Sequence, residues 1–298
     1  MKWNPEDDRI LVEIERWEDQ RFRTGKAAMI VGFFFSPIDS AIDRILPQKL
    51  LSKAIGPMKK TLKSLQDTST NFVNIDALLD KTSDSGIEVD SLLEMKELPT
   101  PYLDELAQSY FSRNQIVTTL QGAGFATAGF ALALLDIPLI FMHNMKMVLQ
   151  IGACYGYDPD LKSERDFAYK IFCLVASERE KDRQLAIDDI NAAISSMVKR
   201  NLIGSELRGM AAKEISELAI TKIIQWYARR KLSSGIPIVG IVISGGFNYL
   251  FTKEMATYAY MLYRKRFIQD KLALGLEASE IANTAPIKRK RKKRMVQV

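Results

Sequence analysis

The side chains best suited to acid–base chemistry are few, and two of them lie in one segment of the chain. Asp136 and His143 are seven residues apart, and His143 is the one histidine in the 298-residue sequence. Seven residues place both side chains on one helix face but about 10 Å apart along the axis, too far for a direct hydrogen bond. Together with Tyr157, they are the candidates for general acid–base catalysis. An enzyme of unrecognised, hydrolase-like type would have its pocket beside Asp136.

Motifs for metal, cofactor or nucleophilic chemistry are absent or wrongly spaced. One histidine and two cysteines nearly exclude a zinc site built from several His or Cys ligands. Gly122, Gly124 and Gly129 resemble a dinucleotide fingerprint, but the spacing differs and no strand precedes them. A serine nucleophile elbow is also missing. The sequence therefore predicts neither a metal site nor a cofactor, and it favours a protein that is not an enzyme.

A run of seven cations near the C-terminus dominates the charge pattern. The net charge is +6, and without this run 35 basic residues face 36 acidic ones. Such a run can bind anionic lipid at about 1 kcal/mol per charge near the surface, bind nucleic acid non-specifically, act as a nuclear localisation signal, or simply solubilise the chain. The membrane or anion contacts that we predict are Lys288, Arg289, Lys290, Arg291, Lys292, Lys293 and Arg294.

Apolar residues recur at helical spacing along most of the chain, and no stretch alternates with period two. We therefore expect an all-α, multi-helix bundle with about two-thirds of its residues in helices. Residues 1–275 are predicted to form a single domain, and residues 276–298 a disordered linker and polybasic tail. The expected helices cover residues 4–24, 48–66, 114–135, 136–155, 163–177, 178–200, 205–232 and 237–267, with another starting at residue 99 and polar loops over 67–74 and 82–90.

Asp136-Ile137-Pro138 is predicted to mark a break between two helices. Asp is a good N-cap, and proline is tolerated in the first turn of a helix. One helix is therefore expected to end near Leu135 and the next to begin at Asp136.

Two glycine-rich apolar segments, residues 115–142 and 235–251, are expected at the centre of the bundle. Their small residues would let helices approach closely. They are either a buried core hairpin or a membrane-contacting hairpin, because about 20 strongly apolar residues are needed to span a bilayer.

The last helix ends in an aromatic and arginine-rich segment that includes Tyr258, Tyr260, Tyr263, Arg264 and Arg266. One interpretation is core packing of the rings with solvated cations. The other is an interfacial belt at the level of lipid headgroups.

The sequence favours a reducing, cytoplasmic location. Cys154 and Cys173 lie in apolar surroundings and are best explained as small buried hydrophobic residues. Acidic residues near the N-terminus stand where a signal peptide would have its apolar core.

An ordered set of motifs resembles the EcsC family over roughly residues 10–270. The positions that carry the resemblance are Trp17, Asp136, Pro138, Tyr155, Gly156, Asp158, Pro237, Gly240 and Arg264. Lys146 departs from the arginine more usual there. The resemblance implies a helical bacterial protein of a family named for a protein encoded beside an ABC transporter. It implies no catalytic residues.

These observations lead to a non-enzymatic helical protein that associates peripherally with the cytoplasmic face of the inner membrane. Its expected partners are an anionic membrane surface and an ABC transporter. An enzyme with a pocket near Asp136, an integral membrane helical hairpin, and a protein that binds nucleic acid through its tail remain as alternatives.

Overall fold

The computed structural model describes residues 3–23, 56, 73–111, 130–177, 180–203 and 240–284. These residues form helices joined by turns, and no strand occurs among them. The all-α multi-helix bundle expected from the sequence is confirmed. The predicted helix over 205–232, the predicted helix over 48–66 apart from residue 56, residues 115–129 of the first glycine-rich apolar segment, residues 235–239 of the second and the polybasic run fall outside the described residues.

Helix α1 (Pro5–Glu18) begins where the Asn4-Pro5 signal predicts. Asn4 accepts hydrogen bonds from the backbone N–H groups of Glu6 and Asp7, and Asp7 accepts one from the backbone of Asn4 in return, which completes a capping box. A short π-helical turn, η1 (Asp19–Arg23), follows directly. The start of α1 is thus fixed by the hydrogen bonds between Asn4 and the first turn of the helix.

Residues 73–111 differ from the prediction at one point, the loop expected over residues 82–90. Helix α4 (Ile75–Asp84) extends into the stretch 82–90. Thr82 belongs to this helix: its side chain is buried, and its hydroxyl donates a hydrogen bond to the backbone carbonyl of Leu78. The turn comes at Gly86, whose φ is +82°. The short helix α5 (Leu92–Met95) is capped by Ser91, and another helix covers residues 100–111.

Helix α7 (Phe130–Cys154) overturns the predicted break at Asp136. It runs without interruption through Asp136 and Pro138, so Asp136 is not an N-cap. Pro138 removes one backbone donor and costs the helix a hydrogen bond. Most of residues 140–154 of the same helix pack in the core, and this burial offsets that cost.

Helices α8 (Lys162–Val175) and α9 (Glu180–Ile203) match their predictions within a few residues. Helix α11 (Gly240–Thr284) is longer than predicted and includes residues 276–284, which we had assigned to the linker.

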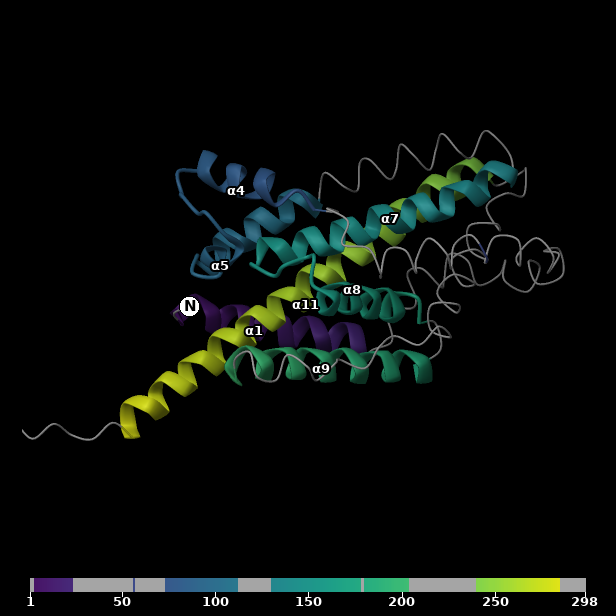
Figure 1. The fold of residues 1–298 in the computed structure, drawn as a ribbon. Coiled ribbons are helices and arrows are strands. Elements are labelled where there is room, and N and C mark those ends of the chain that lie inside the picture. The colour runs from purple at the N-terminus through teal and green to yellow at the C-terminus, as the bar shows by residue number, and fades with distance from the viewer. Residues whose placement is uncertain are drawn as a thin grey trace, which may run out of the picture.

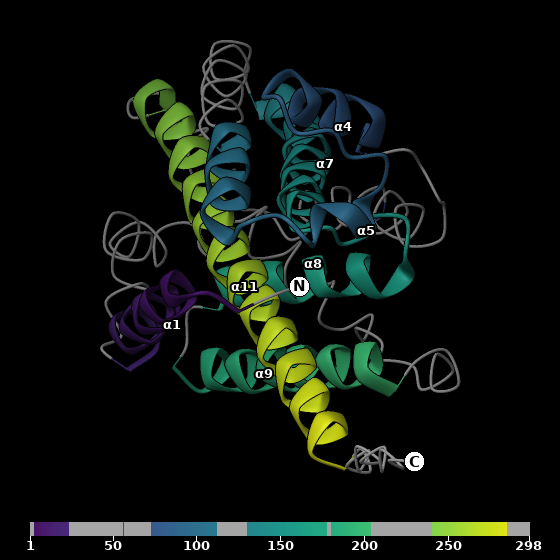
Figure 2. The same cartoon turned by 90° about the vertical axis from the view of Figure 1, so that its left-hand side faces the viewer.

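Helix α11 is the axis of the fold. It packs against α7, α8, α9 and α1, and both views show it running diagonally through the molecule with the other helices around it (Figures 1 and 2). Its C-terminal end projects beyond the other described helices on the side opposite α4. A helix of 45 residues is about 67 Å long, so it can contact the bundle and still extend past it.

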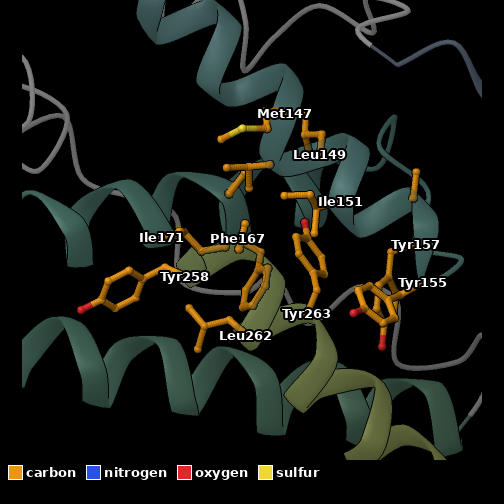
Figure 3. Packing of buried hydrophobic residues seen from close by; sticks show 14 of the residues in the cluster. Met147, Leu149, Ile151, Tyr155, Tyr157, Phe167, Ile171, Tyr258, Leu262 and Tyr263 are labelled. Atoms are coloured by element: carbon orange, nitrogen blue, oxygen red, sulfur yellow. The ribbon is translucent and has the colours of Figure 1, made fainter. Parts of the chain in front are cut away.

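The core lies where α7, α8 and α11 cross. Figure 3 shows Tyr263 of α11 pointing toward Ile151 of α7, with Phe167 of α8 beside it. The rings of Phe167 and Tyr263 meet edge to face with centroids 5.1 Å apart. Gly152 makes this crossing possible, because a Cβ added there would lie 2.5 Å from the Tyr263 ring.

Among the described residues, no helix is both long enough and apolar enough to cross a membrane.

Replacement of Gly152 by Ala is predicted to destabilise the protein by about 1–3 kcal/mol, because the added methyl group overlaps a fully buried ring. Gly275→Ala is the matched control on α11, since nothing lies within 4 Å of its added Cβ; it should be neutral or stabilise by up to about 1 kcal/mol. Urea denaturation followed by circular dichroism measures both. Equal effects of the two changes would show that the α7–α11 contact is not tight.

Candidate functional site

Three buried charge clusters lie along α11, and four of the residues that the sequence analysis named, Tyr155, Tyr157, Arg264 and Arg266, belong to them. The first, which we call the Glu164 cluster, is formed by Glu164 of α8, Tyr157 in the α7–α8 turn, and Arg266 and Asp270 of α11. Arg266 donates two hydrogen bonds to Glu164, at 2.7 and 2.8 Å, and both side chains are 4% exposed. A bidentate arginine–carboxylate pair of this kind compensates two charges that have left water.

Tyr157 lies between Asp270 and the Arg266–Glu164 pair. Its hydroxyl donates to Asp270 at 2.8 Å, while the Arg266 guanidinium lies 3.7 Å from its ring centroid. Asn201 of α9 donates to both carboxylate oxygens of Asp270. One turn residue and one α9 residue therefore hold the carboxylate of α11 in place.

The second cluster, the Asp104 cluster, lies beside the first and joins four segments. Asp104, from the helix over residues 100–111, accepts a hydrogen bond from Tyr155 at 2.7 Å and pairs with Arg264 at 2.8 Å. Arg264 also pairs with Glu13 of α1 at 3.0 Å. Tyr260 of α11 lies under the guanidinium, 5.4 Å from ring centroid to Cζ.

The third cluster, the Asp7 cluster, ties the two ends of the described chain together. Lys271 donates to Asp7 at 2.8 Å and to Thr100 at 3.1 Å, and Thr100 donates to Asp7 at 2.6 Å. All three side chains are buried. Asp7 therefore serves both the capping box of α1 and an ion pair with a residue 264 positions away.

Burial sets the protonation of these groups. It raises the pKa of Tyr155, Tyr157 and Tyr263 well above the ordinary value, and neighbouring carboxylates raise it further. Burial alone would lower the pKa of Arg266, but Glu164 more than compensates and holds that pKa above the ordinary value. Tyr157 is consequently a neutral hydrogen-bond donor, and its phenolate is far from available as a base.

The catalytic candidates do not form one site. His143 is half-buried on α7, and eleven residues of helix, about 16 Å of axial rise, separate it from the end of α7 where Tyr157 lies. Asp136 lies in α7, seven residues before His143. The described residues contain no group of three or more His, Cys, Asp or Glu side chains arranged to hold a metal ion.

Most of the predicted motif positions have a structural role. Trp17 packs edge to face on Phe22 and Tyr258, and Asp158 accepts from the backbone of Asp160 in the α7–α8 turn. Gly156 has a φ of +77°, and an added Cβ would lie 2.5 Å from the carbonyl of Leu92. Gly240 is the first residue of α11, Pro138 lies within α7, and Pro237 lies outside the described residues.

The aromatic and arginine-rich segment of α11 is packed in the core. Arg264 and Arg266 are 5% and 4% exposed, so the expectation of solvated cations was wrong, and these arginines are not placed to face lipid headgroups. Sequence reasoning missed their partners because Glu13, Asp104 and Glu164 lie in unremarkable charged stretches. The one signal for Asp104 is its place on the apolar face of its helix, beside Leu103 and Ala107.

Comparison with known proteins gives a family match and a relative in the curated proteins. The model of the EcsC protein family matches residues 8–268. The chain is similar to the uncharacterized protein YdbA of Bacillus subtilis (strain 168), with 23% identity over 265 residues that cover 88% of this chain and 93% of that protein. No solved structure matches.

Glu164→Gln is predicted to destabilise the fold by about 3–5 kcal/mol, because it leaves the Arg266 charge buried without its partner. Glu13→Gln is the matched control, since it also removes one arginine partner but from a carboxylate that is 58% exposed; it should cost less than about 1 kcal/mol. Urea denaturation compares the two variants. A small loss for Glu164→Gln would mean that water reaches the Glu164 cluster.

The buried tyrosines predict loss of stability in alkali. The pKa of Tyr258 and Tyr260 is raised to about 12, whereas tyrosines of the unfolded chain ionise near 10. The folded state therefore keeps protons that the unfolded state has lost, so stability is intact below about pH 10 and falls as pH rises toward 12. Phenolate absorbance and circular dichroism recorded together test this. Ionisation of all tyrosines near pH 10 without loss of helix would contradict it.

Proposed function

The chain belongs to the EcsC protein family, and from this we propose that it is a non-enzymatic helical protein that binds the cytoplasmic face of the membrane peripherally, with an ABC transporter as its partner there. The observation that carries the proposal is the position of the polybasic run. Helix α11 ends at Thr284, and Lys288 follows four residues later. The run is therefore attached to the end of α11 that projects beyond the other helices (Figures 1 and 2).

One acidic stretch of the described body is suited to facing away from an anionic surface. The stretch over residues 74–105 exposes eight carboxylates but one lysine, Lys81. Helix α4 lies on the side of the molecule opposite the C-terminal end of α11. The tail can thus approach anionic lipid while this acidic side, which lipid would repel, faces away. The exposed carboxylates are Asp76, Asp80, Asp84, Glu88, Asp90, Glu94, Glu97 and Glu105.

The three buried clusters support a non-enzymatic function. Their acidic and basic groups pair with each other, and Tyr157, the catalytic candidate among them, is 3% exposed and holds its proton tightly. Catalytic acids and bases need a pKa near the working pH and a path to substrate. These clusters are instead suited to holding α11 against its neighbours.

Co-sedimentation with vesicles tests the proposal. The full chain should bind vesicles that contain anionic lipid and should bind neutral vesicles weakly. A chain that ends at Pro286 should lose at least about tenfold in affinity for the anionic vesicles, because each cation near the surface contributes about 1 kcal/mol. Added salt should weaken the binding of the full chain.

Two controls separate the tail from the general charge. A Lys146→Gln/Lys253→Gln variant removes two exposed body cations and should keep its binding. Equal binding by the truncated chain would mean that the helical body, not the tail, contacts the vesicle. Carbonate extraction would then show whether the protein is integral to the membrane. If neither protein binds vesicles, the proposal is wrong, and steeply salt-dependent binding to nucleic acid would assign the tail to that partner instead.

A further inference from the structure

One basic side chain at the edge of the Glu164 cluster, Lys96, differs from the cations inside the three clusters. Lys96 follows α5, and its ammonium lies 4.6 Å from the centroid of the Tyr157 ring. The ring of Tyr157 thus contacts two cations, Lys96 and Arg266. The stem of Lys96 covers Gly156, where an added Cβ would meet its Cγ at 2.5 Å. The side chain is therefore held by the turn between α7 and α8.

Lys96 has no ion-pair partner in the described part of the chain. The nearby cations of α11 all have one: Arg264 pairs with Asp104, Arg266 with Glu164, and Lys271 with Asp7. Those three cations are also buried, whereas Lys96 is half-buried. Lys96 is consequently an amine at the edge of a charged core, held in place but not neutralised by a salt bridge.

On balance, burial shifts Lys96 toward its neutral, nucleophilic form, although the face of the Tyr157 ring attracts its ammonium. Burial lowers the pKa of Lys96 and outweighs the attraction of Asp270; Arg266 lowers it further, and Glu164 acts in the opposite direction. The fourth neighbour, Tyr157, is neutral because its own pKa is raised. A lysine amine that is partly desolvated beside another cation is the type of group that attacks carbonyl carbon.

We propose that Lys96 is a covalent modification site, at which the side-chain amine accepts an acyl group from a small activated acyl donor of the acyl phosphate class. The nitrogen lone pair attacks the carbonyl carbon and an N–C bond forms. The C–O bond to phosphate then breaks, inorganic phosphate leaves with that electron pair, and the surplus proton of the nitrogen passes to water. The product is a neutral N-acyl lysine, and no oxidant or reductant is required.

Acylation would alter the cluster in a defined way. The positive charge over Tyr157 would be lost, and so would its attraction to Asp270. The added acyl group would lie at the α5 edge of the turn that Gly156 forms. This inference concerns the folded body and does not depend on membrane binding.

Timed labelling of the full-length protein with acetyl phosphate at pH 7.5 tests the proposal. Peptide mass spectrometry gives the initial rate of acetylation at each lysine. Each rate is then divided by the rate at the same lysine in the urea-unfolded protein. Lys96 should react at least about threefold faster on this scale than Lys146 and Lys253, which are exposed. A rate at Lys96 equal to or below those of the two reference lysines would overturn the proposal.

Two further measurements identify the cause. In the wild-type protein, the rate at Lys96 should level off at a lower pH than the rates at Lys146 and Lys253. In Asp270→Asn, loss of the carboxylate that attracts the ammonium should raise the rate at Lys96 and leave the reference lysines unchanged. If all lysines of that variant react as in urea, the variant is unfolded and the wild-type pH profile decides alone. A common pH profile for the three lysines would refute the inference.

Discussion

The pairing of Arg266 with Glu164 is the constraint on which the arrangement of helices depends. Both charges are buried, and an uncompensated buried charge costs several kcal/mol. Helix α11 places further charged groups, Arg264, Asp270 and Lys271, in the same interior. Each needs a partner from another segment, and α1, α8, α9, the helix over residues 100–111 and the α7–α8 turn supply them. A rotation or slip of α11 would separate several of these pairs at once, so the clusters define its register.

The two residues of each buried ion pair lie far apart along the chain, so the clusters join helices that are distant in sequence. Asp7 and Lys271 are 264 positions apart, and Glu164 and Arg266 are 102 apart. Such contacts form only after the intervening chain has been brought together, at the cost of loop entropy. The N-terminal helix and the end of the last helix are thereby joined in one body. The apolar crossing of α7, α8 and α11 supplies the area that offsets this cost, and Gly152 lets the helices approach closely enough to bury it.

Because the buried charges pair with each other, the groups available to a partner lie at the edges of the fold. Charged side chains of the interior already bind each other, so they offer little to an outside ligand. The half-buried Lys96 is different, because no carboxylate of the described residues forms an ion pair with it, and Lys288–Arg294 is a run of seven cations with no acidic residue among them. The run is suited to a large anionic surface, and Lys96 to a small electrophile. Both assignments follow from the positions of these cations.

The sequence by itself determined the helical class, the family resemblance, the start of α1 and the ranges of α8 and α9. These depend on local signals, namely caps, helical periodicity and ordered motifs, which need no knowledge of distant residues. It failed at Asp136, where a cap and proline signal predicted a break but the helix continues from Phe130 to Cys154. It also predicted that Arg264 and Arg266 face either solvent or lipid headgroups, whereas both are buried in the core. Only the tertiary structure decided that, because the burial of an arginine depends on a carboxylate that comes near in space while remaining up to 251 residues away in the chain, as Glu13 is from Arg264.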